Sequence, residues 1–272
     1  MPCCWDALSA RLIERAGFPL TFMSGFAVAA ARLALPDTQL ISYAEMLDSG
    51  RAICGAVGIP VIGDADTGYG NAVNVKRTIH GYAEAGFAAV MIEDQVAPKR
   101  CGHTRGKDVV PRGEALRRIR AAVDARDEGA GILILARTDA AAVHGLDEAI
   151  ARAQAFRDAG ADILFVEAPR SEAELEAVAR ALAGSVLMVN LVEGGDTPLL
   201  APERLAALGF RIAAHPLTLL AVTVKAAQDA LAGMRDGAHP GEVERVSFEA
   251  LRELVGFPAY DAEARRYATR DD

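Results

Sequence analysis

The sequence predicts a (β/α)8 barrel of the TIM type, and three observations support this fold class. The chain has 272 residues, which is long for most single domains but ordinary for one α/β barrel. Short, continuously apolar runs alternate with longer amphipathic runs, as expected for parallel strands covered by helices. Eight candidate strands can be counted, and that number favours a closed barrel over an open doubly wound sheet.

The strand-like runs are short, apolar and bounded by polar residues or glycine. In chain order they are LTFMSG (20–25), IPVIGDAD (59–66), AAVMIED (88–94), GILILARTD (131–139), DILFVEAP (162–169), VLMVNLVE (186–193) and FRIAAHP (210–216). The opening residues MPCCW (1–5) are interpreted as the end of one more strand. A first strand as short as this could weaken the closure of the barrel.

The segments between the strands show helical periodicity. Clear examples are DALSARLIERAG (6–17), NVKRTIHGYAEAG (74–86) and LDEAIARAQAFRDAG (146–160). Each of these three ends in glycine, which is a common signal for the C-terminus of a helix. We therefore expect a helix-to-strand joint after each of these glycines.

The pattern after Pro216 is helical to the end of the chain, through LTLLAVTVKAAQDALAGM (217–234), SFEALRELVGF (247–257) and a charged tail. No linker marks a second domain, so we expect one domain over 1–272, with the barrel in 1–216 and a helical extension in 217–272. These helices exceed what a barrel needs. They are expected to pack on a neighbouring subunit of a homo-oligomer.

Composition excludes several functional classes. The chain is 51% hydrophobic and carries a net charge of −8, which argues against a nucleic-acid or anionic-membrane partner. No apolar run reaches membrane-spanning length, and no secretory signal is visible, so a soluble cytoplasmic protein is expected. The four cysteines have the spacing of neither a disulfide framework nor a zinc site.

Polar residues end seven of the predicted strands. They are Ser24-Gly25, Asp64-Ala65-Asp66, Glu93-Asp94, Arg137-Thr138-Asp139, Glu167, Asn190 and His215. In a barrel, all strands end at one face, and active sites form there. So many polar strand ends are difficult to explain by solvation alone, and they predict a functional site.

Three of these carboxylates predict a metal site. Asp64 and Asp66 lie two residues apart on a strand, so their side chains share a face, and Glu93 ends the next strand. Three oxygen ligands around one point, completed by water, suit Mg²⁺, with Mn²⁺ as a substitute. The alternative is that such residues cap helices. Capping is the preferred interpretation for Asp94 and Asp139.

Two further strand-end features have more than one interpretation. Arg137 could form a structural ion pair with a neighbouring carboxylate, or it could hold a substrate carboxylate with its guanidinium group. The glycine-rich turn DTGYGN (66–71) is only a weak signal for a phosphate-binding loop, because its spacing matches no known phosphate motif.

Cys101 is the most informative single residue. It lies in EDQVAPKRCGHTRGKDVVP (93–111), beside Lys99, Arg100 and His103, in a stretch too polar for a core. A lone cysteine is most often a small buried apolar residue. Nearby cations, however, lower the pKa of a thiol and make it usable as an acid or base.

Five motifs occur in order at these strand ends: DADTGYGN, IEDQ, PKRCGH, ARTDA and LFVEA. Together they resemble the isocitrate lyase/phosphoenolpyruvate mutase superfamily, over nearly the whole chain. The segments PKRCGHTRGK and NLVEGGDTPLL are most similar to its short-chain lyases, which cleave 2-methylisocitrate, 2,3-dimethylmalate or, in the petal-death type, oxaloacetate and alkylmalates. The mutase branch lacks the Cys-Gly-His triplet.

The resemblance implies a (β/α)8 barrel, a Mg²⁺ ion, an enolate intermediate and a tetramer built from helix-swapped dimers. It implies that Asp66 contacts the metal directly, while Asp64 and Glu93 hold its water ligands. It implies substrate contacts from Ser24, Gly25, Phe26, Asp37, Arg137, Glu167, Asn190 and His215. It also implies that Lys99, Arg100, Cys101 and His103 lie on a loop that closes over the substrate, with Cys101 as the general acid.

Two positions depart from the family pattern. Phe26 stands where methylisocitrate lyases have glycine and petal-death-type enzymes have serine, which leaves the size of the pocket open. His215 stands where these lyases usually have tyrosine.

The predicted function is a Mg²⁺-dependent carbon–carbon lyase for a 2-hydroxy dicarboxylate or tricarboxylate. Cleavage leaves a carbanion, which can be held as an enolate and then protonated by a thiol on a closing loop. The alternatives are an oxaloacetate hydrolase or decarboxylase, a carboxyphosphoenolpyruvate or phosphonate mutase, and a non-catalytic barrel that binds a dicarboxylate.

Overall fold

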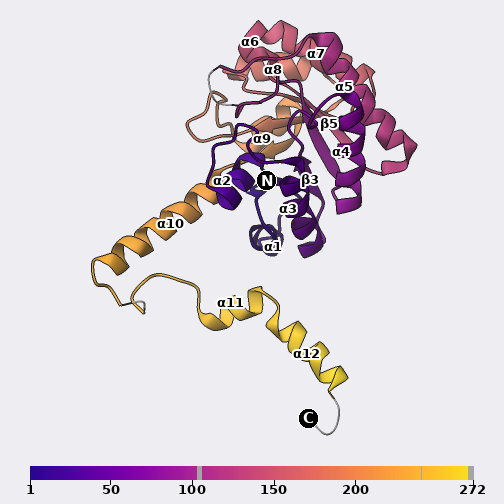
Figure 1. The fold of residues 1–272 in the computed structure, drawn as a ribbon. Coiled ribbons are helices and arrows are strands. Elements are labelled where there is room, and N and C mark those ends of the chain that lie inside the picture. The colour runs from indigo at the N-terminus through magenta and orange to yellow at the C-terminus, as the bar shows by residue number, and fades with distance from the viewer. Residues whose placement is uncertain (103–105, 240, 269–272) are drawn as a thin grey trace. The chain divides into compact units, whose positions relative to one another are not determined.

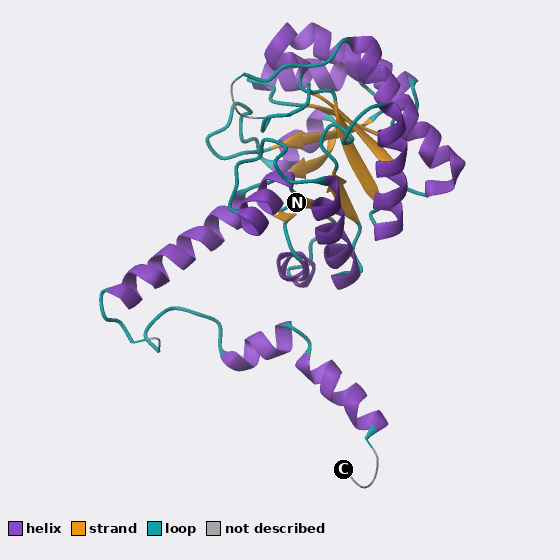
Figure 2. Ribbon diagram, in the orientation of Figure 1, coloured by secondary structure: helices purple, strands orange, loops and turns teal. Residues whose placement is uncertain are grey.

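The computed structural model describes residues 1–102, 106–239 and 241–268. Within them, eight parallel strands form one sheet in chain order, each paired with the next. Figure 1 shows the course of the chain, coloured from the N-terminus to the C-terminus. Helices surround these strands on the outside (Figure 2). The strands are β1 (Cys3–Cys4), β2 (Thr21–Met23), β3 (Val61–Asp64), β4 (Ala89–Glu93), β5 (Leu133–Thr138), β6 (Ile163–Val166), β7 (Val186–Asn190) and β8 (Phe210–Ala214).

Helices fill most of the segments between the strands and continue after β8. They are α1 (Ala7–Arg15), α2 (Gly25–Leu33), α3 (Tyr43–Ala56), α4 (Ala72–Ala85), α5 (Arg112–Ala125), the π-type turn η1 (Arg126–Ala130), α6 (Ala140–His144), α7 (Leu146–Asp158), α8 (Glu172–Ala181), α9 (Pro202–Leu208), α10 (Thr218–Arg235), α11 (Phe248–Leu254) and α12 (Phe257–Tyr267).

Backbone contacts join the first strand to the last. The His215 amide donates to the carbonyl of Met1 at 2.8 Å, and the Cys3 amide donates to the carbonyl of His215 at 3.3 Å. A parallel bridge also pairs Pro2 with His215. The strands therefore form a nearly closed barrel, and the predicted fold class is confirmed. The first strand is short, as predicted, but it still reaches β8.

Alternation along the strands divides the core into two parts. In β4, Ala89 and Met91 belong to a cluster to which all eight strands contribute, whereas Val90 and Ile92 pack in a second cluster that includes helical residues. Successive strand side chains point to opposite faces, so the first cluster fills the barrel and the second lies under the helices. A packed interior of this kind leaves the strand ends as the place for a site.

The predicted helix-to-strand joints are confirmed. Gly86 ends α4 with φ +98°, and Gly17 and Gly160 follow α1 and α7 with φ +86° and +100°. These are left-handed conformations that glycine adopts without the steric cost other residues meet. The joints after these three helices thus follow directly from the sequence.

The chain divides into two compact units, Met1–Leu220 and Ala221–Asp272. The first contains the whole barrel. In α10, α11 and α12, no described residue is buried. Whether the chain is one domain, and whether these helices are exchanged between subunits, both stay predictions. None of the helices within the described ranges is both long and apolar enough to span a membrane.

Candidate active site

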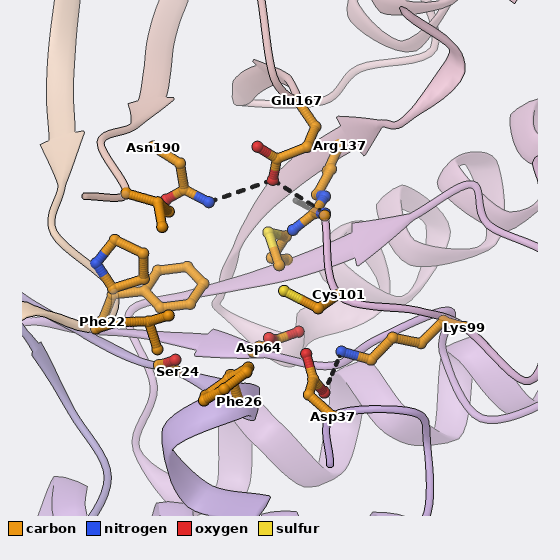
Figure 3. Close-up of a pocket in the computed structure, with 15 residues that line it drawn as sticks. Phe22, Ser24, Phe26, Asp37, Asp64, Lys99, Cys101, Arg137, Glu167 and Asn190 are labelled. Carbon is orange, nitrogen blue, oxygen red and sulfur yellow. Dashed lines mark hydrogen bonds and ion pairs between the residues drawn. The ribbon is translucent and has the colours of Figure 1, made fainter. Parts of the chain in front are cut away.

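A cavity of about 90 Å³ lies at the carboxyl ends of the strands, within the barrel unit (Figure 3). Most of the predicted site residues line it: Ser24, Phe26, Asp37, Asp64, Lys99, Cys101, Arg137, Glu167 and Asn190. Phe22, Met91, Gly102, Val192, Pro216 and Leu217 line it as well, and none of these six was predicted as a site residue. Residues far apart in sequence therefore converge on one small space.

The remaining predicted residues lie elsewhere. Gly25, Asp66 and Glu93 are buried and contact the lining residues Asp64, Lys99 and Arg137, respectively, without lining the cavity themselves, and Arg100 is exposed. His215 is half-buried and is not among the lining residues, since the structure places Pro216 and Leu217 there instead. The placement of His103, the other predicted catalytic residue, lies outside the described residues.

Asp64 is held by backbone groups on two sides. Its Oδ2 accepts a hydrogen bond from the amide of Gly25 at 3.1 Å, and its Oδ1 accepts one from the amide of Asp66 at 3.0 Å. An added Cβ at Gly25 would lie only 2.6 Å from this carboxylate, so a side chain at that position would displace it. Below the carboxylate, the hydroxyl of buried Tyr82 donates to the carbonyl of Asp64 at 2.7 Å. These contacts fix Asp64 in one orientation.

Lys99 lies between two buried carboxylates. Its Nζ is 2.5 Å from Asp37 and 3.0 Å from Asp66, and its side chain is 4% exposed. Burial by itself would lower the pKa of Lys99, but the carboxylates, Asp66 foremost, raise it well above its usual value. The ammonium group therefore stays charged and brings positive charge to the cavity.

Two buried carboxylates keep oxygens without hydrogen bonds. Among the described residues, neither oxygen of Asp66 accepts a hydrogen bond, although Lys99 is within ion-pair distance, and Oε1 of Glu93 accepts none. Burial raises the pKa of Asp66 to about 6, against the opposing effect of Lys99. Burial also raises the pKa of Glu93 well above its usual range, against that of Arg137. Buried carboxylate oxygens without hydrogen bonds destabilise the folded protein unless a bound ion or water serves as their partner.

These oxygens fit a hard divalent cation, which prefers carboxylate and water ligands. Within the described parts of the chain, however, no group of three or more Asp, Glu, His or Cys side chains is arranged to hold a metal directly. Asp64, Asp66 and Glu93 are therefore not arranged to bind one metal ion directly with all three carboxylates, as the sequence predicted. A site with Asp66 as the direct ligand, and with water between the cation and the other two, stays a prediction.

Arg137 is the centre of a buried ion-pair network. Its Nε lies 2.8 Å from Asp139 and 3.3 Å from Glu93, and its Nη2 lies 3.0 Å from Glu167. Asn190 donates to the same Glu167 oxygen at 3.2 Å (Figure 3). Arg137 thus forms the structural ion pairs that the sequence allowed. It also lines the cavity, so the substrate-binding alternative stays a prediction.

The capping interpretation of Asp94 and Asp139 is wrong. Asp139 stands at the N-cap position of α6 but makes no side-chain capping bond, because its oxygens bind Arg137 and Lys107. Asp94 accepts from the hydroxyl of Thr138 at 2.7 Å and from the amide of Asp139 at 2.9 Å. Both carboxylates support the strand end beneath the site. The local sequence rule failed because Arg137 and Lys107 bind Asp139, and because Arg152 binds Asp94.

The loop with Cys101 reaches the cavity. Figure 3 shows the Cys101 sulfur pointing into it, with Lys99 also drawn beside Asp37. Cys101 is half-buried, and none of the four cysteines is in a disulfide. Burial raises the pKa of each of the other three thiols, that of Cys4 to about 12 and that of Cys54 to about 11, and it also raises that of Cys3. Of the four cysteines, Cys101 is the one that lines the cavity.

Several supporting residues were not predicted. Gln39 donates to Thr67 at 3.2 Å and accepts from the amide of Lys99 at 3.2 Å, while Gln95 and Lys107 contact the backbone beside Cys101. The only sequence signal for the last two was their place within the motif-bearing segment 93–111. The apolar lining residues gave no signal, because they read as ordinary strand and helix residues.

Comparison with known proteins places this geometry in context. A family model described as Phosphoenolpyruvate phosphomutase matches residues 1–235. The chain is 41% identical to 2,3-dimethylmalate lyase of Eubacterium barkeri over 98% of this chain and 93% of that protein. It is 40% identical to the chloroplastic carboxyvinyl-carboxyphosphonate phosphorylmutase of Arabidopsis thaliana, over 97% of this chain and 80% of that one.

Solved structures of similar enzymes also match this chain closely. A crystal structure of 2,3-dimethylmalate lyase has a TM-score of 0.94 at 37% identity and covers 100% of this chain and 91% of its own. Oxaloacetate acetylhydrolase with the inhibitor 3,3-difluorooxalacetate has a TM-score of 0.93 at 37% identity, with 99% and 92% covered. Phosphonopyruvate hydrolase with oxalate and Mg²⁺ has a TM-score of 0.87 at 31% identity, with 98% and 93% covered.

Proposed function

The chain belongs to the phosphoenolpyruvate mutase/isocitrate lyase superfamily, and from this premise we propose that it is a Mg²⁺-dependent carbon–carbon lyase. The proposed substrate is a 2-hydroxy dicarboxylate or tricarboxylate of the alkylmalate or 2-methylisocitrate type. The products are pyruvate, or a related 2-oxo acid, and a second carboxylic acid.

The main support for this proposal is that Cys101 lines the same cavity as buried charged side chains. A thiol, the Lys99 ammonium and the Arg137 guanidinium line the same space. The oxygens of Asp66 and Glu93 that accept no hydrogen bond belong to side chains within ion-pair distance of Lys99 and Arg137. A non-catalytic binding barrel would need the two cations but would not need the thiol.

Each group has a task in the cleavage. When bound at Asp66, with Asp64 and Glu93 behind its water ligands, Mg²⁺ would supply Lewis-acid stabilisation of developing negative charge. The substrate hydroxyl gives its proton to one of the carboxylates that line the cavity, Asp37, Asp64 or Glu167, and its carbon becomes the carbonyl of the 2-oxo acid. The adjacent carbon–carbon bond breaks, and the electron pair stays on the carbon beside the second carboxylate. Lys99 offers that carboxylate a positive charge in a buried site, where electrostatic stabilisation is strong.

The carbanion must then receive a proton on carbon. The Cys101 sulfur points into the cavity and is the proposed donor (Figure 3). The loop that carries it also contributes Gly102 to the lining of the cavity. A proton donor that arrives with a covering loop protonates the intermediate and limits the access of water.

The apolar residues favour one substrate class within the proposal. Phe22, Phe26, Met91, Val192 and Leu217 contribute a large part of the lining. Among the described lining residues, the cations are Lys99 and Arg137, and both already contact buried carboxylates. A third substrate carboxylate would therefore meet mostly apolar surface, which is costly. This supports an alkyl-substituted malate over a tricarboxylate.

The test is proton NMR of the protein with Mg²⁺ and a panel of alkylmalates, 2-methylisocitrate and oxaloacetate. We expect pyruvate, or another 2-oxo acid, from an alkylmalate, and slower or no turnover of 2-methylisocitrate. Oxalate and acetate from oxaloacetate, with no cleavage of any 2-hydroxy acid, would show a hydrolase instead. Conversion of a phosphonate or phosphoenolpyruvate would show a mutase. No turnover of any 2-hydroxy acid would refute the proposed lyase.

A further inference from the structure

Two buried side chains hold the peptide on either side of Cys101. On the N-terminal side, Gln95 is 1% exposed and makes a pair of bonds with the backbone of Arg100: its Nε2 donates to the carbonyl at 2.9 Å, and its Oε1 accepts from the amide at 2.9 Å. On the C-terminal side, the Lys107 ammonium donates to the carbonyl of Gly102. Neither side chain is among the cavity-lining residues, so neither is placed to react with substrate.

Lys107 connects this loop to the strand end under the site. Its Nζ lies 3.0 Å from Oδ1 of Asp139, and the two side chains are 4% and 0% exposed. The same Asp139 oxygen accepts from Nη2 of Arg137 at 3.0 Å. One carboxylate at the end of β5 thus binds both the cation that lines the cavity and the cation that holds the loop. A lysine that only stabilised the loop would not need to be buried against this particular carboxylate.

Gly102 fits closely against the other side of the network. An added Cβ there would lie 2.4 Å from Nη2 of Arg137 and 2.7 Å from Oε2 of Glu167. Both neighbours are held by ion pairs, so they cannot easily move aside. The backbone beside Cys101 therefore rests directly on the charged network, and glycine is the residue that allows this distance.

We propose that Lys107, together with Gln95, is a positioning residue that holds Cys101 over the cavity, through Gly102 and the Asp139 carboxylate. The inference rests on the proposed function, since it assigns these residues to the delivery of the Cys101 proton. Lys107 acts through Asp139 and the Gly102 carbonyl, and not by contact with substrate. Its ammonium group therefore sets where the thiol lies, while Cys101 supplies the proton.

The first experiment uses Lys107→Met, which keeps the length of the side chain and removes the charge. Misplacement of a reacting group by about 1 Å costs on the order of a hundredfold in rate, so we expect kcat to fall by about 10- to 100-fold. KM should change less, because Lys107 does not touch substrate. Lys107→Arg keeps a buried donor and a positive charge, and it should recover most of the rate.

The second experiment measures the alkylation rate of Cys101 with iodoacetamide, by mass spectrometry of the peptide. Release of the loop should speed alkylation of Cys101 by about tenfold in Lys107→Met, because thiol reactivity follows access. If Lys107 acted only as a nearby charge, its removal would raise the thiol pKa and slow the reaction. The two roles therefore predict opposite signs.

Gly102→Ala disturbs the same contact without removing a charge. It should lower kcat and speed alkylation of Cys101 in the same way. If Lys107→Met does not fold, this variant tests the proposed positioning of Cys101 by itself. The matched controls are Lys76→Met, which removes a partly exposed ion pair with Glu128, and Gly113→Ala, whose added Cβ would meet its nearest atom at 3.8 Å. Both controls should match the parent protein.

Slower or unchanged alkylation in both Lys107→Met and Gly102→Ala would overturn the inference, and so would a lower melting temperature with kcat intact. The labelling result does not depend on the substrate. If the parent protein cleaves no tested 2-hydroxy acid, the proposed function fails on its own, and the position of Cys101 is still decided by the labelling rates.

Discussion

At Cys101, a catalytic role and a structural role of the thiol can be distinguished by replacing its sulfur atom with oxygen. Cys101→Ser keeps the size of the side chain but replaces an acidic thiol by a weakly acidic hydroxyl. A positioned general acid is worth about 10² to 10⁴ in rate, so we predict a loss of that order in turnover. Mg²⁺ binding and the melting temperature should stay the same, because no ligand and no core contact is removed.

Cys54→Ser is the matched control for Cys101. Burial raises the pKa of Cys54 to about 11, and this thiol lies in α3, away from the cavity lining. Its replacement should leave kcat unchanged. If Cys101→Ser instead lowered the melting temperature and kept its rate, the thiol would be structural, and solvent would be the source of the proton.

Asp66 predicts how cation binding depends on pH. The pKa of its carboxyl is raised to about 6 by burial, so the protein without metal takes up a proton there as the pH falls through 6. The cation and the proton compete for the same oxygens. The apparent Kd for Mg²⁺ should therefore be nearly constant above pH 7 and rise about tenfold per pH unit well below pH 6.

Calorimetric titration with Mg²⁺, or Mn²⁺ titration followed by electron paramagnetic resonance, between pH 5 and 8 checks this dependence. Protein treated with EDTA should be inactive and regain activity with either ion, and Asp66→Asn should bind neither. A Kd that does not change between pH 5 and 7, or full activity after rigorous metal removal, would contradict the assignment of Asp66 as the ligand.

At the scale of elements, the contact of α4 with β3 sets the position of Asp64. Tyr82 is fully buried in α4, stacks on Phe87 at 4.9 Å between ring centres, and donates to the carbonyl of Asp64. Tyr82→Phe keeps the ring and leaves that buried carbonyl without this donor. We predict a loss of about 1–3 kcal/mol in the free energy of unfolding, the usual cost of an unsatisfied buried group.

Urea unfolding of the two proteins measures this difference. Tyr260→Phe is the control, because Tyr260 is 73% exposed and its hydroxyl can bond to water. Equal stability of Tyr82→Phe and the parent protein would show that water or a shift of the chain replaces the hydroxyl. In that case α4 would support β3 through packing alone.

The strands and their ends could be predicted because their signals are local. Apolar runs with polar ends mark β3, β4 and β5, and a glycine after an amphipathic run marks the C-terminus of a helix. The site residues on those ends followed from one topological rule, that parallel strands in a barrel end at the same face. The resemblance to a known family then supplied the predicted roles of Asp37, Phe26 and the loop residues, which stay predictions.

The error at Asp139 came from ion pairs that a rule for helix caps does not take into account. Asp139 was interpreted as a helix cap, but Lys107, 32 residues away, and Arg137 bind its oxygens. The predicted contact of His215 with substrate stays a prediction, since β8 ends at Ala214 and it is Pro216 and Leu217 that line the cavity. The apolar lining was not predicted, because no sequence pattern distinguishes a residue that faces a cavity from one that faces a core.

At the scale of the whole molecule, the helices after the barrel predict self-association. The unit Ala221–Asp272 exposes large apolar side chains: Val222, Val224, Leu231, Met234, Val246, Phe248, Leu251, Val255, Phe257, Tyr260 and Tyr267. Extended apolar surface of this kind marks an interaction site. We predict a homotetramer, built as a dimer of dimers, by light scattering at micromolar concentration.

A variant with Leu231→Glu and Phe248→Glu should shift the protein toward smaller species, because each change puts a charge on the proposed contact surface. A charge reversal at exposed Arg180 of α8, Arg180→Glu, is the control and should keep the assembly. A monomeric parent protein at micromolar concentration would refute the prediction and leave the apolar surface without an explanation.

The apolar residues that line the cavity take no part in the ion pairs of its charged residues. This separation affects how the substrate range of such an enzyme can evolve. Lys99 and Arg137 each pair with more than one buried carboxylate, so a change at either cation disturbs several ion pairs. Phe26, Val192 and Leu217 take no part in those ion pairs. Mutation could therefore reshape the substrate range at these three positions while the charged network is inherited intact. A lineage with this division can acquire new substrates by single steps, without passing through an inactive ancestor.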